Sequence, residues 1–182
     1  MIIGLTGTIA AGKGTLVNYF KEKGFTISTM SDIIKVELDK RLLENTRDNF
    51  RVVGNSLREE FGAGILVKKI IENNQNKDLV IDGIRSIGEV EELKKHENSY
   101  LISIDAPIET RFKWMIERGK ESDPKTFELF IEADKKNNGN WIENTGIEVL
   151  KCMEKSDFNI YNDGSLENLS KKIEEIINKI LI

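Results

Sequence analysis

One feature near the start of the chain constrains the fold more than any other: the glycine-rich segment Gly7-Thr8-Ile9-Ala10-Ala11-Gly12-Lys13-Gly14-Thr15. It follows an apolar run at 1–6 and precedes a predicted helix at 13–23. Glycine lets backbone N–H groups approach an anion closely, because side chains would block that approach. The segment therefore predicts a strand–loop–helix unit that cradles phosphate, with Lys13 reaching the outer phosphates.

The rest of the chain alternates between apolar strand patterns and amphipathic helix patterns. This alternation predicts an α/β fold in three layers, with a parallel sheet covered by helices on both faces. At 182 residues we expect a single domain. The expected strands are 1–6, 25–30, 78–82, 100–104 and 158–161. The expected helices are 13–23, 32–43, 48–73 with a break near Gly62 and Gly64, 87–96, 108–119, 124–137, 145–155 and 165–180.

Charge and cysteine content exclude several classes of protein. The 27 basic and 31 acidic residues give a net charge of −4, which argues against a general nucleic-acid binder. A single cysteine, Cys152, rules out an internal disulfide and fits a reducing, cytoplasmic compartment. No apolar run is long enough for a membrane span, and residues 1–5 lack the features of a signal peptide. We therefore expect no nucleic acid and no membrane among the partners.

Ligands of open α/β sheets bind at the carboxyl ends of the strands, and Asp82 ends the third expected strand. A carboxylate there can orient Mg²⁺ or its waters beside the phosphates, with Thr15 as a second candidate ligand. The alternative is that Asp82 only caps the turn after the strand. We expect ATP and Mg²⁺ as cofactors, and seven residues of the glycine-rich segment at the nucleotide: Gly7, Ala10, Ala11, Gly12, Lys13, Gly14 and Thr15.

The ending Gly-Lys-Gly-Thr resembles the phosphate loop (P-loop) of adenylate kinase and its nucleoside-monophosphate kinase relatives. The run Asp82-Gly83-Ile84-Arg85-Ser86 resembles the Asp-Gly-Phe-Pro-Arg-Thr run of adenylate kinases, and 27–35 resembles their Ser-Thr-Gly-Asp-x-Leu-Arg segment. The segment 156–166 resembles one common in dephospho-CoA kinases and related archaeal kinases. The resemblance implies a five-stranded P-loop kinase domain, with an acceptor-binding arm at about 32–75 and a lid at about 112–145.

By this resemblance Arg85 would hold the phosphate of the acceptor, and three arm residues, Asp32, Lys35 and Arg58, would line the acceptor site. Asp32 would also N-cap the next helix. Lys35 stands where the family has an arginine, so it would offer a point charge in place of a fork. A solvated helix lysine is the alternative for Lys35.

Arg111 and Arg118 are the candidates for lid arginines that fold over the nucleotide. Phosphoryl transfer depends on positioning and on neutralising the charge of the moving group, so we expect Lys13, Arg111, Arg118 and Asp82 to be catalytic. The alternative for the two arginines is a solvated basic helix face paired with Glu109 and Glu117.

The loop after the last strand carries Asp163, Gly164 and Ser165. The resemblance implies that this loop packs near adenine through backbone contacts. Ser165 would also N-cap the last helix, and capping alone could explain the motif.

The resemblance implies an ATP-dependent kinase that transfers the γ-phosphoryl group to a small acceptor, and it leaves three hypotheses open. A nucleoside or deoxynucleoside monophosphate is favoured by the run at 82–86. Dephospho-CoA is favoured by the opening residues and by 156–166, and its hydroxyl acceptor would need a base such as Asp32. A nucleotide-dependent switch with slow ATPase activity is the third. We expect a monomer or weak homodimer.

Overall fold

Five parallel strands form the centre of the molecule in the computed structural model, which describes residues 1–75, 77–121, 123–139 and 148–180. The strand order is β2-β3-β1-β4-β5, and every pair of neighbours is parallel. The strands are β1 (Ile2–Gly7), β2 (Thr26–Thr29), β3 (Leu79–Asp82), β4 (Ser99–Asp105) and β5 (Phe158–Tyr161). The predicted α/β fold and its five strands are confirmed.

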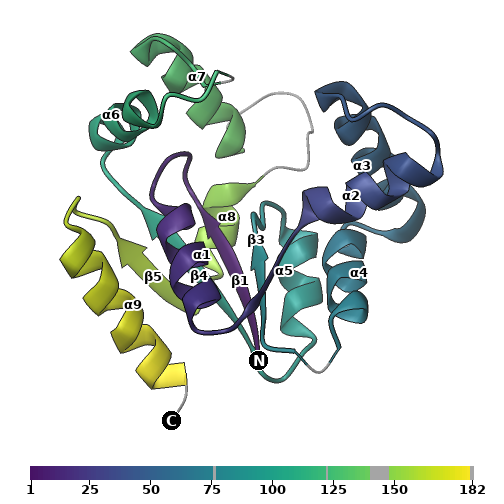
Figure 1. Cartoon of the computed structure of the whole chain (residues 1–182), viewed down its shortest axis with the longest axis horizontal. Helices are drawn as coiled ribbons and strands as arrows, with labels where there is room; N and C mark the ends of the chain where they lie inside the picture. Colours follow the sequence, from purple (N-terminus) through teal and green to yellow (C-terminus); the bar gives the residue numbers. More distant parts are fainter. Residues whose placement is uncertain (76, 122, 140–147, 181–182) are drawn as a thin grey trace.

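Helices cover both faces of this sheet and extend beyond its carboxyl edge (Figure 1). Those in the described part of the chain are α1 (Lys13–Glu22), α2 (Met30–Lys40), α3 (Arg47–Phe61), α4 (Ile65–Asn73), α5 (Ile87–Lys94), α6 (Ile108–Arg118), α7 (Phe127–Asn137), α8 (Val149–Glu154) and α9 (Leu166–Ile180). The expected break near Gly62 and Gly64 separates α3 from α4.

The apolar core lies in two parts, one on each face of the sheet. On β3, Leu79 and Ile81 belong to the part formed with α2, α3, α4, α5 and α8, whereas Val80 belongs to the part formed with α1 and α9. This alternation follows from the two-residue period of a strand. Because both faces are covered, a polar ligand can reach the sheet only at the ends of its strands.

The start of α2 differs from the expectation that Asp32 is its N-cap. The N-cap is Thr29, whose hydroxyl oxygen accepts the backbone N–H of Asp32 at 3.2 Å. The Asp32 carboxylate in turn accepts the backbone N–H of Thr29 at 2.6 Å. The two residues form a capping box, which satisfies two backbone donors and begins the helix at Met30.

Two helical parts flank the loop that joins β1 to α1 (Figure 1). The arm consists of α2, α3 and α4, and it joins the core where α4 packs against α5. The second part is the α6–α7 hairpin, in which Phe112 contacts Phe127 and Phe130 with ring centroids 5.3 and 5.6 Å apart. Of the lid expected at about 112–145, residues 122 and 140–145 lie outside the described residues.

Close approach of the arm to α5 leads to a testable prediction at Gly88. Alanine normally stabilises a helix relative to glycine by about 1 kcal/mol. A Cβ at Gly88, however, would lie 2.4 Å from the Cβ of Ala63. We therefore expect Gly88→Ala to destabilise the protein by about 1–3 kcal/mol in urea unfolding.

Gly14 provides the matched control, because it is also the second residue of its helix and a Cβ there would meet nothing within 4 Å. Gly14→Ala should leave the free energy of unfolding unchanged or raise it by up to about 1 kcal/mol. Equal effects of the two substitutions would contradict the tight contact between Ala63 and Gly88.

No helix in the described ranges is long and apolar enough to cross a membrane.

Candidate functional site

The loop from Gly7 to Gly12 has three residues with positive φ directly before a helix. Gly7, Ala10 and Gly12 have positive φ values of 144°, 61° and 107°. For Ala10 this conformation is strained, whereas glycine adopts it readily. The loop ends at the start of α1, whose first N–H groups have no acceptor within the helix. These N–H groups and the helix dipole favour an anion at this place.

Side chains at the ends of β4 and β5 fix the loop in place by hydrogen bonds. Thr8 Oγ1 donates to Asp105 Oδ1 at 2.6 Å, and Asn162 Nδ2 donates to the carbonyl oxygen of Ala11 at 3.0 Å. Asn162 is buried, and a Cβ at Gly12 would lie only 2.7 Å from its Nδ2. Gly12 is therefore required both for its φ value and for this close approach.

Lys13 lies against the loop and donates from Nζ to the carbonyl oxygens of Gly7 and Thr8, at 2.7 and 2.9 Å. Burial lowers the pKa of Lys13 to about 8, an effect that Asp82 opposes and that Arg85, Arg111 and Arg118 increase. The charges of these four residues therefore act on Lys13. Of the predicted acceptor-site residues only Arg85 is among them, and Asp32, Lys35 and Arg58 are not.

The lowered pKa of Lys13 predicts a pH dependence of nucleotide binding. Lys13 loses its proton as pH rises through about 8, and a neutral amine attracts phosphate less. Because about a tenth of the lysine stays protonated one unit above its pKa, affinity for ADP should fall about tenfold between pH 7 and 9. Titration calorimetry would measure this fall. The Lys13→Ala variant should lack it, and a flat profile in the unaltered protein would contradict the prediction.

Asp82 stands at the carboxyl end of β3, and its Oδ1 atom is buried without a hydrogen-bond partner in the described part of the chain. Burial raises its pKa, while Lys13 and Arg85 act in the opposite direction. A buried carboxylate oxygen without a partner fits a site that a hydrated cation completes. No cluster of three or more acidic, histidine or cysteine side chains among the described residues could hold a metal alone. If Mg²⁺ binds here, the residues predicted to hold it or its waters are Asp82 and Thr15.

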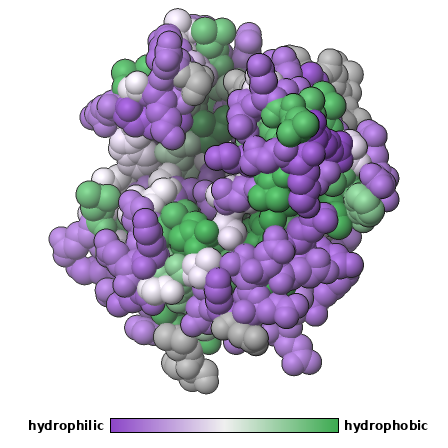
Figure 2. All heavy atoms as spheres, turned by 45° about the vertical axis from the view of Figure 1, so that its right-hand side comes forward, coloured by the Kyte–Doolittle hydropathy of each residue, from purple (hydrophilic) through white to green (hydrophobic). Residues whose placement is uncertain are grey.

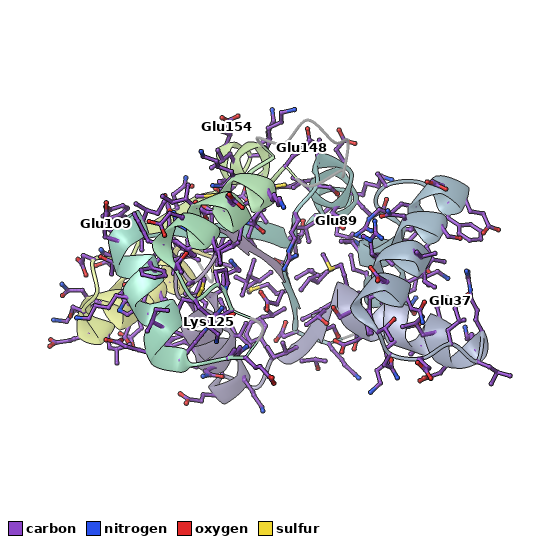
Figure 3. The ribbon with its side chains drawn as sticks, turned by 90° about the horizontal axis from the view of Figure 1, so that it is seen from above. Glu37, Glu89, Glu109, Lys125, Glu148 and Glu154 are labelled. Atoms are coloured by element: carbon purple, nitrogen blue, oxygen red, sulfur yellow. The ribbon has the colours of Figure 1, made fainter. Side chains whose placement is uncertain are left out.

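Glu89 joins the loop after β3 to the arm. Its Oε2 accepts the backbone N–H groups of Arg85 and Ser86, at 2.9 and 3.2 Å, and its Oε1 accepts Arg58 Nη2 at 3.0 Å. The Glu89 side chain is 1% exposed, whereas the Arg85 residue is exposed. Glu89 therefore fixes the backbone at Arg85 and ties Arg58 of the arm to α5. Figure 3 labels Glu89 at this junction.

The other predicted arm residues are less constrained by tertiary contacts. Lys35 is exposed and has no salt-bridge partner among the described residues. Asp32 is exposed as well, but one of its carboxylate oxygens accepts hydrogen bonds from Thr29.

Figure 2 shows the surface hollowed between the arm and the α6–α7 hairpin, with largely hydrophilic side chains along both rims.

The two predicted lid arginines differ sharply in their surroundings. Arg118 is partly exposed and makes a two-point pair with Asp123, at 2.7 and 2.8 Å. Arg111 is 5% exposed and is held by Asp134, Ala106 and Ile9. The expectation that Arg111 is a mobile lid arginine is therefore corrected, because every bond it makes fixes it in place. The alternative of a solvated face paired with Glu109 is also wrong for Arg111.

After β5, Ser165 caps α9, since its hydroxyl oxygen accepts the backbone N–H of Asn168 at 3.2 Å. Asp163 accepts the backbone N–H of Ser165 and the ammonium of Lys172, and both interactions lower its pKa. Gly164 has a φ of 99° and donates its N–H to Asn162. The capping function of Ser165 is confirmed, and contact of this loop with adenine stays a prediction.

Sequence reasoning missed four residues of the site: Asp105, Asn162, Glu89 and Asp134. The first two follow the rule that ligand-site residues gather where strands end, so their positions carried a signal. Glu89 completes the local pattern Ser86-x-x-Glu89, a capping box that was visible in the sequence. Asp134 had no such signal, because it meets Arg111 only through tertiary packing.

The sheet order, the phosphate loop and the two flanking helical parts define a P-loop nucleotide-binding protein with a kinase-like fold. A family model described as an AAA domain matches residues 3–151. The chain is 36% identical over 189 residues to the UPF0200 protein of Pyrococcus abyssi, covering 100% of this chain and 97% of the relative. It is 34% identical over 186 residues to the UPF0200 protein of Methanocaldococcus jannaschii, covering 100% and 91%. The chain belongs to the UPF0200 family.

Solved structures with the same fold include two kinases. A shikimate kinase from Bacteroides thetaiotaomicron aligns with a TM-score of 0.61 at 13% identity, covering 100% of this chain and 99% of the other. A dephospho-CoA kinase from Campylobacter jejuni aligns with a TM-score of 0.56 at 19% identity, covering 98% and 96%. At these identities the likeness shows the fold alone.

Proposed function

We propose that this protein is an ATP-dependent small-metabolite kinase that transfers the γ-phosphoryl group to a nucleoside or deoxynucleoside monophosphate. One observation carries the proposal: Lys13 and Arg111 both bond to carbonyl oxygens of the phosphate loop, and Asp82 ends β3 with a buried Oδ1 that has no partner among the described residues. Phosphoryl transfer needs positioning and charge neutralisation more than covalent chemistry from the protein. A site with several cations beside a phosphate cradle fits a reaction between two phosphate-bearing molecules.

In this proposal the loop N–H groups and Lys13 bind the β- and γ-phosphates of ATP. Mg²⁺, when bound, neutralises phosphate charge, and Asp82 and Thr15 are the residues placed to hold it or its waters. Arg85 binds the phosphate of the acceptor, and Arg118 stabilises the transferring group after leaving Asp123. Arg58 and Lys35 on the arm add positive charge on the acceptor side.

The surroundings of Asp32 favour a phosphate acceptor over a hydroxyl acceptor. A hydroxyl needs a base to take its proton, and Asp32 was the candidate from the sequence. Its carboxylate accepts both the backbone N–H and the hydroxyl of Thr29, at 2.6 and 2.9 Å. These bonds tie Asp32 to the helix start. A monophosphate acceptor requires no such base, so the proposal does not depend on freeing Asp32.

A second candidate, dephospho-CoA kinase activity, is favoured by the loop after β5. Asn162 and Gly164 in that loop contact each other, and Asn162 also contacts the phosphate loop. This segment resembles its counterpart in dephospho-CoA kinases. The third candidate, a nucleotide-dependent switch, would use the same phosphate loop without a small acceptor.

A single panel of reactions separates these candidates. The protein is incubated with Mg·ATP and, in turn, with each common nucleoside and deoxynucleoside monophosphate, dephospho-CoA and shikimate, and products are separated by chromatography. We expect turnover of one or more monophosphates. Turnover of dephospho-CoA or shikimate alone would overturn the first choice, and ATP hydrolysis that only a macromolecular partner stimulates would favour the switch.

A further inference from the structure

Arg111 makes a set of contacts that none of the roles above explains. It lies in α6, and its Nη1 atom donates to the carbonyl oxygen of Ile9 in the phosphate loop at 3.1 Å. Its Nε atom donates to the carbonyl oxygen of Ala106 at 2.9 Å. Its Nη1 and Nη2 atoms bind the two carboxylate oxygens of Asp134 in α7, at 2.6 and 3.0 Å. Both charged residues are 5% exposed.

The contact with Ile9 bears on how the cradle presents its N–H groups. In a planar trans peptide the C=O of one residue and the N–H of the next point in opposite directions. The carbonyl of Ile9 points toward Arg111, so the N–H of Ala10 points away from Arg111, to the inner side of the loop. Ala10 has a φ of 61°, a conformation that costs free energy for a residue with a Cβ. The Arg111 bond is one of the interactions that keep this strained peptide in place.

The contact with Asp134 ties the same guanidinium to the α6–α7 hairpin. A two-point arginine–carboxylate pair fixes the orientation of the guanidinium plane as well as its position. The guanidinium also lies over the ring of Phe130, 5.5 Å from its centroid, and Phe130 packs on Phe112 of α6. A displacement of α7 would therefore change the contact of Arg111 with the phosphate loop.

We propose that Arg111 is a positioning residue through which the α6–α7 hairpin controls the phosphate loop. Asp134 holds the guanidinium, the guanidinium holds the carbonyl of Ile9, and the N–H of Ala10 is thereby directed at the nucleotide phosphate. Affinity for the nucleotide then depends on the Arg111–Asp134 pair, in which Asp134 acts through Arg111. This inference rests on nucleotide binding and requires no particular acceptor.

The variant Asp134→Asn gives a test in which the positioning role and simple electrostatics predict opposite changes in the affinity for ADP. Removal of a carboxylate near a phosphate site would by charge alone strengthen the binding of ADP. If Asp134 acts by holding Arg111, the binding of ADP should weaken about fivefold to twentyfold, because each charge-assisted hydrogen bond contributes on that order. Glu117→Gln, an exposed change of the same charge on α6, is the control and should leave binding unchanged. Dissociation constants for ADP come from titration calorimetry.

Two further variants guard against a folding defect, because removing one partner of a buried pair is costly. The double variant Arg111→Met/Asp134→Leu removes both charges and replaces them with apolar groups, which such sites tolerate better. Arg111→Lys keeps the charge but loses the fork. Both should fold, as judged by circular dichroism, and both should bind ADP more weakly than the unaltered protein.

Unchanged or tighter ADP binding by a folded Asp134→Asn or Arg111→Lys variant would overturn the inference, as would a failure of the unaltered protein to bind ADP. Failure of the proposed function has a different signature. ADP would bind, and the variants would weaken that binding, while no small acceptor in the panel is phosphorylated.

Discussion

Replacing Lys13 with alanine is expected to lower the rate of phosphoryl transfer by about 10²–10³-fold or more, with the protein still folded. Lys13 is the cation that lies in the phosphate loop, where it bonds to the carbonyl oxygens of Gly7 and Thr8. Burial already disfavours its charged form, as its pKa of about 8 indicates. Its removal should therefore cost little stability, while it removes a positive charge from the proposed phosphate site.

The control is Lys21→Ala, which removes an exposed lysine from the same helix, α1. Initial rates with the best acceptor of the panel, ADP dissociation constants and circular dichroism spectra together separate chemistry from folding. Retained turnover in a folded Lys13→Ala variant would refute the assignment of the phosphate loop as the donor site.

Asp82→Asn is expected to slow turnover by about 10²-fold and to raise the concentration of Mg²⁺ needed for half-maximal rate. Asparagine matches aspartate in shape but lacks the charge that attracts a cation or its waters. The Oδ1 atom of Asp82 is buried without a partner among the described residues, so the carboxylate is poorly satisfied when the metal and nucleotide are absent.

The same substitution should leave the melting temperature unchanged or raise it at pH 7. Because burial raises the pKa of Asp82, folding disfavours its ionised form, and the resulting loss of stability is present above that raised pKa. Asparagine removes this cost. A site that lowers stability while it serves function is expected where a cation completes it.

Asp78→Asn is the matched control, since Asp78 directly precedes β3, at the opposite end of this strand from Asp82, and is mostly exposed. It should change neither the rate nor the Mg²⁺ requirement. An Asp82→Asn variant with normal turnover and an unchanged Mg²⁺ requirement would show that Asp82 only terminates the strand.

The sequence alone determined the parts of this protein that depend on local spacing. The glycines and Lys13 predicted the phosphate loop within nine residues, because glycine readily adopts the positive φ found at Gly7 and Gly12. Apolar runs with a period of two or 3.6 specified the strands and helices to within a few residues. The one clear local error, at Asp32, arose because Thr29 and Asp32 form a reciprocal cap that begins the helix at Met30.

Only the tertiary structure decided which partners the charged side chains of the site bind. Arg58 lies in the region that binds the acceptor in the family that the sequence resembles, and Arg111 lies where that family carries lid arginines. The structure pairs Arg58 with Glu89 and Arg111 with Asp134. Those partners lie 31 and 23 residues away along the chain. A long side chain takes whichever acceptor packing brings within reach, and spacing in the sequence does not encode that choice. The phosphate loop could therefore be predicted from the sequence, whereas its link to the α6–α7 hairpin through Arg111 could be found only in the folded structure.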